Sequence, residues 1–219
     1  SHREMAAAFM QIANVVCTDF TINQLLQKRE IAAFMEQDGY VFVGGFAYGD
    51  ILGSGVATTL IIKNQLNDIF TPIFADEKKF VLGVCNGCQI LVKLGLFGDK
   101  VDVCENLSHK FESRWLPVNW NDQMVGIWIA HGEGRFVLQP SWDDDSNGDG
   151  NQIVGTYISA DYPLNPNGSM HNAFGIRNGS GNHIAIMPHP ERSVFKWQCE
   201  YIPAELAESY EGPHTPWID

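Results

Sequence analysis

Hydrophobic positions in the first half of the chain alternate between helical spacing and short continuous runs. Helical spacing predicts helices at 4–12, within 22–37, at 56–70 and directly after Cys85. Between them lie short runs rich in β-branched and aromatic residues, which predict buried strands at 15–17, 40–43 and 80–84. Strands that alternate with helices predict an α/β protein with a doubly wound, mostly parallel sheet flanked by helices.

The second half of the chain is dominated by predicted strands. They cover 111–118, 125–130, 153–158, 173–176 and 184–187. We expect the first two to pair antiparallel, so that the sheet carries extra antiparallel strands beside its parallel part. Ligands in such folds bind beyond the carboxyl ends of the parallel strands, and the chemically informative residues of this chain follow those strands.

Composition narrows the class of protein. With 219 residues, of which 45% are hydrophobic, the chain suits one globular domain with a substantial core. Its net charge of −12 argues against nucleic acid or an anionic membrane as a partner. No apolar run approaches the roughly 20 residues that span a bilayer, and no signal-peptide pattern occurs. Five cysteines without framework spacing fit a reducing compartment, so we expect a cytoplasmic protein.

The most informative stretch is 83–89, Gly-Val-Cys-Asn-Gly-Cys-Gln, between a strand run and a helical pattern. Gly-x-Cys-x-Gly at a strand-to-helix turn is the thiol form of a nucleophile elbow, because small flanking residues allow a sharp turn. Cys85 then stands at a helix N-terminus, where unpaired N–H groups and the helix dipole favour thiolate over thiol. We expect the N–H of Asn86 to face a developing oxyanion, and the pattern predicts that Cys85 is a nucleophile.

Two other interpretations of this stretch stay open. Cys85 could be a buried structural thiol, because free cysteines are often buried. Cys85 and Cys88 also have the spacing of a redox pair or of half a zinc site, although the sequence holds no second Cys-x-x-Cys. We favour the nucleophile, with Cys88 as a small apolar helix residue.

A cysteine nucleophile needs a base, usually a histidine held by a third group. The best candidate is His189, in a Pro-His-Pro-Glu turn after the last strand run, with Glu191 behind it to fix the tautomer. Another strand run ends at Gly44 and Gly45, where the missing Cβ atoms let N–H groups face a ligand. Such a turn, with the N–H of Asn86, completes an oxyanion hole, in which each donor contributes roughly 3 kcal/mol to transition-state stabilisation.

Five segments occur in an order that spans almost the whole chain. They are 44–50 (Gly-Gly-Phe-Ala-Tyr-Gly-Asp), 83–89, 130–136 (Ala-His-Gly-Glu-Gly-Arg-Phe), 162–169 (Tyr-Pro-Leu-Asn-Pro-Asn-Gly-Ser) and 187–192 (Met-Pro-His-Pro-Glu-Arg). This set resembles the class I glutamine amidotransferase domains of phosphoribosylformylglycinamidine synthases. The Cys-Asn-Gly-Cys form and the ending Gly-Pro-His-Thr-Pro-Trp-Ile-Asp are more similar to the large single-chain enzymes than to the separate glutaminase subunits.

The resemblance implies a flavodoxin-like fold and a catalytic triad of Cys85, His189 and Glu191. It implies that the cysteine attacks the side-chain carboxamide of glutamine, that ammonia leaves, and that a γ-glutamyl thioester is hydrolysed to glutamate. In this scheme the histidine protonates the leaving ammonia and activates water. The implied substrate-binding residues are Gly44, Gly45, Phe46, Asn86, Gln89, His131 and Gly132. Of these, His131 and Gly132 are implied to contact the amino-acid end of glutamine.

The resemblance also implies a synthetase partner that uses ATP and Mg²⁺. That partner converts formylglycinamide ribonucleotide to formylglycinamidine ribonucleotide with the ammonia, in purine biosynthesis. The chain itself holds no Gly-x-x-x-x-Gly-Lys-Ser/Thr, and no Gly-x-Gly-x-x-Gly follows a strand. We therefore expect no cofactor and no metal in this domain, and a synthetase fused upstream of it.

The chain departs from the family at both ends. The family's domain opens with a strand before its first helix, whereas this chain starts at Ser1, already at that helix. It stops at Asp219, where the family continues into a last helix. We expect residues 1–219 to be a glutaminase domain truncated at both ends, with a gap between the neighbours of the missing first strand.

Several interpretations stay open alongside this one. The chain could be another class I amidotransferase, a γ-glutamyl amide hydrolase, or a non-catalytic assembly module. Asp50 could be a carboxylate that caps a helix or stabilises a turn. Glu133 could lie on a surface that faces the synthetase or at a solvated position. The acidic segment 143–148 begins like an EF-hand loop, but Val154 stands where a bidentate glutamate is needed, so we interpret it as an acidic loop.

Overall fold

The computed structural model describes residues 1–12, 14–139, 142, 150–202, 204, 210 and 213–217. The acidic segment 143–148 lies outside the described residues. The α-helices are α1 (His2–Phe9), α2 (Ile22–Leu26), α3 (Ile31–Met35), α4 (Val56–Gln65), α5 (Asn67–Ala75) and α6 (Asn86–Leu94). The short 3-10 helices are η1 (Ala47–Asp50), η4 (Met170–Asn172), η5 (Pro190–Arg192) and η6 (Lys196–Gln198).

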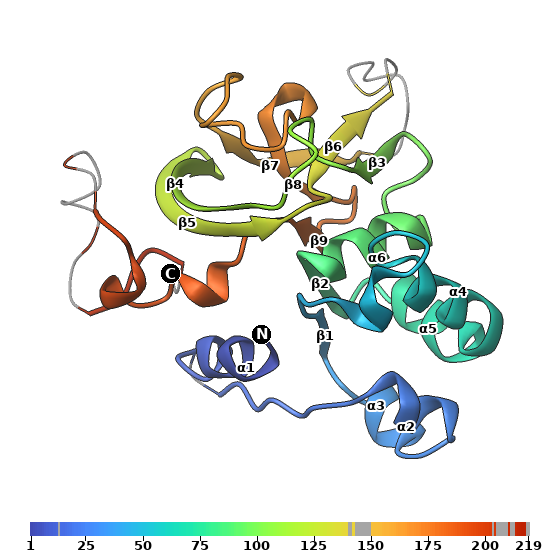
Figure 1. The fold of residues 1–219 in the computed structure, drawn as a ribbon. Helices are drawn as coiled ribbons and strands as arrows, with labels where there is room; N and C mark the ends of the chain where they lie inside the picture. The colour runs from blue at the N-terminus through green and yellow to red at the C-terminus, as the bar shows by residue number, and fades with distance from the viewer. Residues whose placement is uncertain are drawn as a thin grey trace.

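The strands form two sheets in the described part of the chain. They are β1 (Gly39–Phe42), β2 (Phe80–Val84), β3 (Val101–Cys104), β4 (Glu112–Trp120), β5 (Gln123–His131), β6 (Arg135–Leu138), β7 (Gln152–Tyr157), β8 (Ala173–Arg177) and β9 (His183–Ile186). Seven of them form one sheet in the order β1-β2-β9-β8-β7-β4-β5, and β3 pairs with β6. Figure 1 shows β4 and β5 curving strongly at the far end of the large sheet, away from the helices.

The large sheet has a parallel part and an antiparallel part. β1, β2 and β9 are parallel, with Val81 opposite both Tyr40 and His183. The remaining neighbours, from β9 through β8, β7 and β4 to β5, pair antiparallel. This confirms an α/β fold with a parallel core and added antiparallel strands, including the expected β4–β5 pair. The antiparallel part is larger than a mostly parallel sheet would have.

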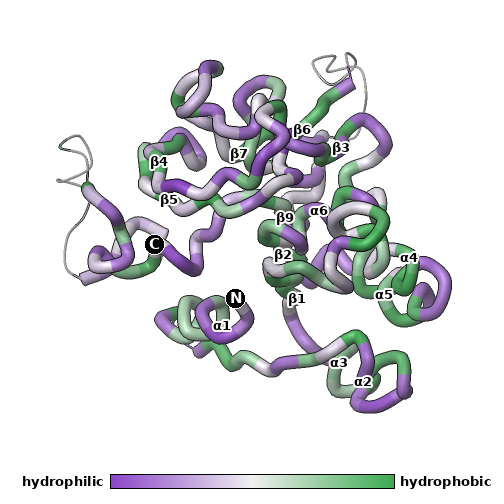
Figure 2. The backbone as a smooth tube through the Cα atoms, viewed as in Figure 1, coloured by the Kyte–Doolittle hydropathy of each residue, from purple (hydrophilic) through white to green (hydrophobic). Residues whose placement is uncertain are grey.

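The main core lies between the parallel strands and the helices beside them. Val81, Val84, Ala185 and Ile186 are almost fully buried, as expected for strands covered on both faces. α6 packs on this part of the sheet with Leu91 completely buried. Figure 2 shows hydrophobic residues concentrated along β2 and along the neighbouring helices α4 and α5. A second cluster of buried side chains fills the curved antiparallel part, between β4, β5, β7 and β8.

Two predicted helices are each divided into two. The stretch 22–37 forms α2 and α3, because Lys28 and Glu30 between them adopt positive φ values of 57° and 58°, which an α-helix does not accommodate. The stretch 56–70 is interrupted at Leu66, whose φ of −129° ends α4 before α5 begins. Neither break has a strong local sequence marker. Within the described residues, no helix is both long and apolar enough to cross a bilayer.

The strand predicted at 15–17 is wrong. These residues are irregular, and they face β1 across a cavity of about 820 Å³ that both segments line. Without a neighbouring strand, their N–H and C=O groups cannot form a ladder, so apolar character alone does not make this run a strand. β1 is accordingly the edge strand of the sheet. The cavity lies beside that edge.

Candidate active site

Cys85 forms a sharp turn between β2 and α6. It is the residue that caps the N-terminus of α6, with φ 53° and ψ −108°, a conformation that costs energy for a non-glycine residue and often marks a functional site. Its N–H donates to the carbonyl of Ile186 on β9 at 2.9 Å. The side chain is 7% exposed. The structure thus has the predicted elbow, with the thiol at the start of a helix.

The glycines flanking Cys85 allow its helix to approach the sheet closely. A Cβ on Gly87 would lie 1.8 Å from the carbonyl oxygen of Phe42 on β1. A Cβ on Gly83 would lie 2.7 Å from the carbonyl oxygen of Gly87. Because atoms cannot approach so closely, any side chain at either position would push α6 away from the strands.

His189 and Glu191 form a buried pair after β9. Nδ1 of the histidine lies 2.7 Å from Oε1 of the glutamate, and both side chains are at most 1% exposed. Because an ionised carboxylate only accepts hydrogen bonds, Nδ1 carries a proton in this pair. The backbone N–H of His189 donates to the carbonyl of Trp128 on β5 at 2.8 Å, which fixes the loop to that strand.

The imidazole of His189 lies against Cys85. A Cβ on Gly44 would be 2.9 Å from Cε1 of His189 and 3.2 Å from the Cβ of Cys85, so the three residues meet at one point. Nε2 of the histidine is buried and has no hydrogen-bond partner within the described residues, which leaves it free to exchange a proton with the sulfur. Residues about a hundred positions apart in the sequence are therefore neighbours.

The electrostatics of this pair favour a thiolate and an imidazolium. Burial opposes ionisation of Cys85, but interactions with the imidazoles of His131 and His189 outweigh burial and lower the pKa of the thiol to about 6. Burial likewise lowers the pKa of His189, but its interactions with Cys85 and Glu191 are stronger and raise it to about 9. Each member of the pair stabilises the charged form of the other.

A second histidine, His131, flanks the sulfur from the end of β5. Its side chain is 2% exposed, and neither ring nitrogen has a hydrogen-bond partner among the residues that the structure describes. The sulfur of Cys85 lies 3.7 Å from the carbonyl oxygen of Ala130, the residue before it. The structure thus brings His131 to the sulfur, and its contact with the amino-acid end of a substrate stays a prediction.

The loop after β5 is held in place by the fully buried side chain of Asn106. Its amide donates to the carbonyls of Lys110 and His131 at 2.9 and 2.8 Å. Its side-chain oxygen accepts from the N–H of Gly134 at 3.0 Å and from the amide of Asn167 at 2.7 Å. Two of these hydrogen bonds hold residues 131–134 directly, and the other two tie the loop to Lys110 and Asn167.

A cavity of about 150 Å³ opens beside Cys85. Its lining residues are Gly45, Phe46, Asp50, Ser54, Cys85, Gln89, Phe111, Ala130, His131, Gly132 and Glu133. Most of the predicted substrate-binding residues are therefore in this wall. Gly44 and Asn86 are not among these lining residues but line the larger cavity beside β1. Gly44 lies against Cys85 and His189, and the side-chain amide of Asn86 donates to Gln89 at 3.0 Å.

Residues 1–219 match the family described as the CobB/CobQ-like glutamine amidotransferase domain, over their whole length. The chain belongs to this family. Its geometry agrees with that assignment, because the elbow cysteine, the histidine–glutamate pair and the cavity occur together at the carboxyl ends of β1, β2 and β9. The alternatives of a purely structural thiol or of a redox pair account for neither the histidine nor the cavity, and Cys88 is completely buried in α6.

Similar proteins extend this amidotransferase assignment. The chain is 34% identical over 248 residues to "Phosphoribosylformylglycinamidine synthase" of Drosophila melanogaster, covering 99% of this chain and 18% of that protein. It is 35% identical over 198 residues to "Phosphoribosylformylglycinamidine synthase subunit PurQ" of Methanococcus maripaludis, covering 80% of this chain and 71% of that subunit. The chain thus spans under a fifth of the large relative and most of the small one.

A solved structure shows the same architecture. "Structure of PurLQS from Thermotoga maritima" superposes with a TM-score of 0.63 at 25% identity, covering 90% of this chain and 84% of that one. The fold of this amidotransferase chain therefore also occurs in a solved protein.

The sequence analysis missed several residues of the amidotransferase cavity. Asp50 and Glu133 were interpreted as turn, solvated or interface residues, and Ser54, Phe111 and Ala130 were not singled out. Three of these residues could have been found, because Asp50, Ala130 and Glu133 stand inside the two motifs that carry other cavity residues. Phe111 had no such marker, since its place beside Phe46, at 6.1 Å between ring centres, depends on the packing of distant loops.

Proposed function

We propose that this chain hydrolyses glutamine to glutamate and ammonia through a thioester on Cys85. One observation carries the proposal: Cys85, at the N-terminus of α6, meets a histidine whose other ring nitrogen is held by Glu191 at 2.7 Å. This is the arrangement that nucleophilic acyl transfer requires, with a nucleophile, a base and a group that orients the base. The family of the chain and the adjoining cavity of about 150 Å³ support glutamine as the substrate.

The first half of the reaction follows from the charges of the pair. The thiolate of Cys85 attacks the side-chain carboxamide carbon, and the carbonyl π electrons move to the oxygen. When the tetrahedral adduct collapses, the C–N bond breaks and the proton on Nε2 of His189 passes to the leaving nitrogen, so that ammonia departs. In the second half, the neutral imidazole takes a proton from water as the water attacks the thioester, and the thiolate leaves with glutamate as product.

Backbone N–H groups are proposed to hold the oxyanion. Asn86 belongs to the first turn of α6, where N–H groups lack intrahelical acceptors and the helix dipole is positive. Gly45 adopts φ 144°, a conformation that a residue with a side chain rarely takes, and no atom crowds its Cα. Each donor of this kind typically lowers the barrier by roughly 3 kcal/mol.

The ammonia is proposed to feed phosphoribosylformylglycinamidine synthase activity in purine biosynthesis. The names of the relatives support this, as does the likeness to the PurLQS structure. The synthetase part is proposed to bind ATP and Mg²⁺ and to lie upstream in the same polypeptide, within a cytoplasmic enzyme. All five cysteines of the chain are free, in keeping with a reducing compartment.

An exposed apolar loop next to the cavity is a candidate contact for this synthetase partner. Phe46, Tyr48, Ile51 and Leu52 are 47–76% exposed, and Phe111 beside Phe46 is 52% exposed. A contiguous group of large exposed apolar residues is typical of a protein–protein contact. Its position at the rim of the cavity would let a docked synthetase part cover the site.

The test is glutamate release by the complete protein that contains this chain. Replacing Cys85 with alanine is expected to abolish release, whereas replacing the exposed Cys17 with alanine is expected to leave it unchanged. Glutamine is expected to react faster than other γ-glutamyl amides. Glutaminase activity that survives Cys85→Ala, or no activity in the unsubstituted protein, would refute the proposal, and the second result would favour an assembly module. Faster turnover of another γ-glutamyl amide would refute glutamine as the substrate.

A further inference from the structure

The cavity beside Cys85 contains two carboxylates that the proposed hydrolysis does not use. Asp50 and Glu133 both line it, with Ser54 between them. The N–H of Ser54 donates to both oxygens of the Glu133 carboxylate, at 3.2 Å each. This contact joins the loop after β5 to the loop after β1, which carries Asp50. Two acidic side chains from distant parts of the sequence therefore face one small cavity.

The two carboxylates repel each other electrostatically. Burial raises the pKa of Asp50, a hydrogen bond from Ser54 opposes the shift, and the negative charge of Glu133 adds to it. Asp50 is also held at φ 52°, outside the usual range of a non-glycine residue. Like charges are thus kept together in a place partly removed from water, at a cost that a cation between them would relieve.

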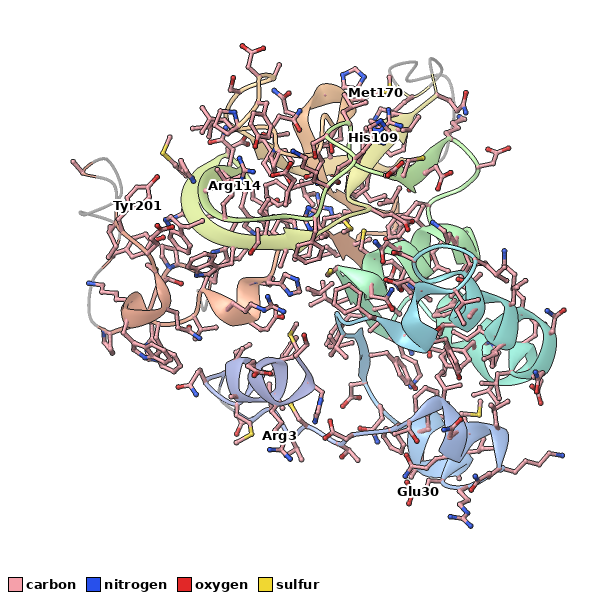
Figure 3. All side chains as sticks on the ribbon, viewed as in Figure 1. Arg3, Glu30, His109, Arg114, Met170 and Tyr201 are labelled. Atoms are coloured by element: carbon pink, nitrogen blue, oxygen red, sulfur yellow. The ribbon has the colours of Figure 1, made fainter. Side chains whose placement is uncertain are left out.

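Within the described residues, no lysine or arginine fills this role. All fourteen Lys and Arg residues belong to the part that the structure describes, and none forms an ion pair with Asp50 or Glu133 there. Arg114, labelled on β4 in Figure 3, instead pairs with Glu112 and lies 4.9 Å from the centre of the Tyr162 ring. A ligand that brings its own positive charge would therefore complete the site.

Both acidic residues are held close to the first turn of α6, which begins at the sulfur. The side-chain amide of Gln89, four residues after Cys85, donates to the backbone carbonyl of Glu133 at 2.6 Å. Gly55, the neighbour of Ser54, packs against the same turn, since a Cβ there would meet the backbone of Gln89 at 3.3 Å. The carboxylate of Asp50 lies 3.5 Å from the side-chain amide of Asn86, the residue after the cysteine. The carboxylates and the thiol therefore belong to one site around the start of this helix.

A buried histidine in the same cavity gives independent evidence that the cavity takes a polar ligand. His131 lines the same cavity and is only 2% exposed. Neither of its ring nitrogens has a hydrogen-bond partner within the described residues. Buried polar atoms are nearly always paired. A ligand that reaches from the sulfur to the carboxylates would pass this ring.

We propose that Asp50 and Glu133 bind the α-ammonium group of the substrate, so that this chain selects free glutamine over amides that lack this charge. The inference rests on the proposed glutaminase function. Glutamine carries both a reactive carboxamide and an ammonium group, which matches a cavity lined by a thiol and by two carboxylates. Both residues are specificity determinants, and neither takes part in breaking the C–N bond.

The test compares two substrates in the complete protein that contains this chain. One is glutamine, and the other is glutaramic acid, which is glutamine without its α-amino group. The substitutions Asp50→Asn and Glu133→Gln keep the size of each side chain and remove its charge. We expect each to lower kcat/KM for glutamine about 10- to 100-fold, chiefly through KM, and to leave kcat/KM for glutaramic acid unchanged. The control Glu77→Gln, at an exposed carboxylate, is expected to change neither.

A labelling experiment separates loss of recognition from loss of the site. Iodoacetamide, which has no ammonium group, is expected to alkylate Cys85 at the same rate in the variants and in the unsubstituted protein. The chloroketone analogue of glutamine has an ammonium group. It is expected to react more slowly with the variants, by a factor similar to their loss in kcat/KM for glutamine. Equal losses with both substrates, or no loss with glutamine, would overturn the inference and leave the glutaminase function standing. An unsubstituted protein that hydrolyses neither substrate would overturn both.

Discussion

Nδ1 of His189 and Oε1 of Glu191 are 2.7 Å apart in a place that water hardly reaches. The contact fixes both the orientation and the tautomer of the imidazole, because the carboxylate can accept only from a protonated Nδ1. The remaining nitrogen then faces Cys85 in the form that can exchange a proton with it. The glutamate therefore acts on the chemistry only through the histidine.

Replacing Glu191 with glutamine is expected to lower kcat strongly. An amide of the same size can donate to Nδ1, which favours the tautomer with its proton on Nε2 and leaves no stabilising charge behind the imidazolium. We expect a loss of about 10²- to 10⁴-fold in kcat with a smaller change in KM, measured as glutamate release. The exposed Glu77→Gln serves as the control, and a loss confined to KM would contradict the positioning role.

Alkylation of Cys85 is expected to follow a titration near pH 6. Since the pKa of this thiol is lowered to about 6, the thiolate is present above that pH and disappears as the pH falls below it. The pKa of His189 is raised to about 9, so the imidazolium that supports the thiolate is lost only above that pH. The rate of reaction with iodoacetamide therefore rises through pH 6 and stays level until about pH 9.

The reaction of the other cysteines with iodoacetamide is measured in Cys85→Ala and subtracted. His189→Gln removes one source of thiolate stabilisation and is expected to move the midpoint to higher pH. A midpoint near the roughly 8.5 of an ordinary thiol in the unsubstituted protein would rule out the charged pair.

Gly87→Ala is expected to destabilise the fold and disturb the elbow together. The added methyl group would lie 1.8 Å from the carbonyl oxygen of Phe42, so α6 must move away from β1. We expect the free energy of unfolding to fall by about 3 kcal/mol, as for severe overpacking, measured by urea denaturation. Gly132→Ala is the matched control, because its nearest neighbour, in Phe111, is 3.9 Å away. An equal effect of the two substitutions would contradict the close approach.

Asn106→Ala is expected to loosen the loop that carries His131. The substitution leaves buried backbone and amide groups without their partners, which costs about 2–4 kcal/mol of stability in total. The same loop lines the cavity, so KM for glutamine is expected to rise as well. Asn64→Ala, which removes one exposed hydrogen bond within α4, is expected to have little effect. Unchanged stability in Asn106→Ala would show that the loop holds its path without this side chain.

Local patterns were sufficient for the parts of the fold whose contacts are close in sequence. The β2–Cys85–α6 elbow was predictable because its glycines, its strand and its helix all stand within fifteen residues. The pairing of His189 with Glu191 was predictable for the same reason. The separation of these residues from Cys85 is far larger. That they meet was inferred from the need of a cysteine nucleophile for a base and from the family resemblance, not from spacing.

The misses share a physical cause, which is dependence on distant partners. Residues 15–17 have strand-like side chains, but a strand needs a hydrogen-bonded neighbour and none lies beside them in the described part of the chain. β3 and β6 are four residues each and pair with one another in a sheet of two strands, so neither gives a strong pattern alone. The meeting of Asp50 with Glu133 depends on a contact between Ser54 and Glu133, which are 79 residues apart.

The hydrogen bond from the backbone of His189 to Trp128 has a mechanical consequence for the reaction centre. This bond ties the loop that carries the imidazole of His189 to β5, and β5 ends at the second imidazole, that of His131. The sulfur of Cys85, in contrast, belongs to the parallel part of the sheet. A shift of β5 moves both rings together relative to the sulfur. A partner that displaces this strand would therefore change the distances of both imidazoles from the sulfur in a single motion, without touching the cysteine.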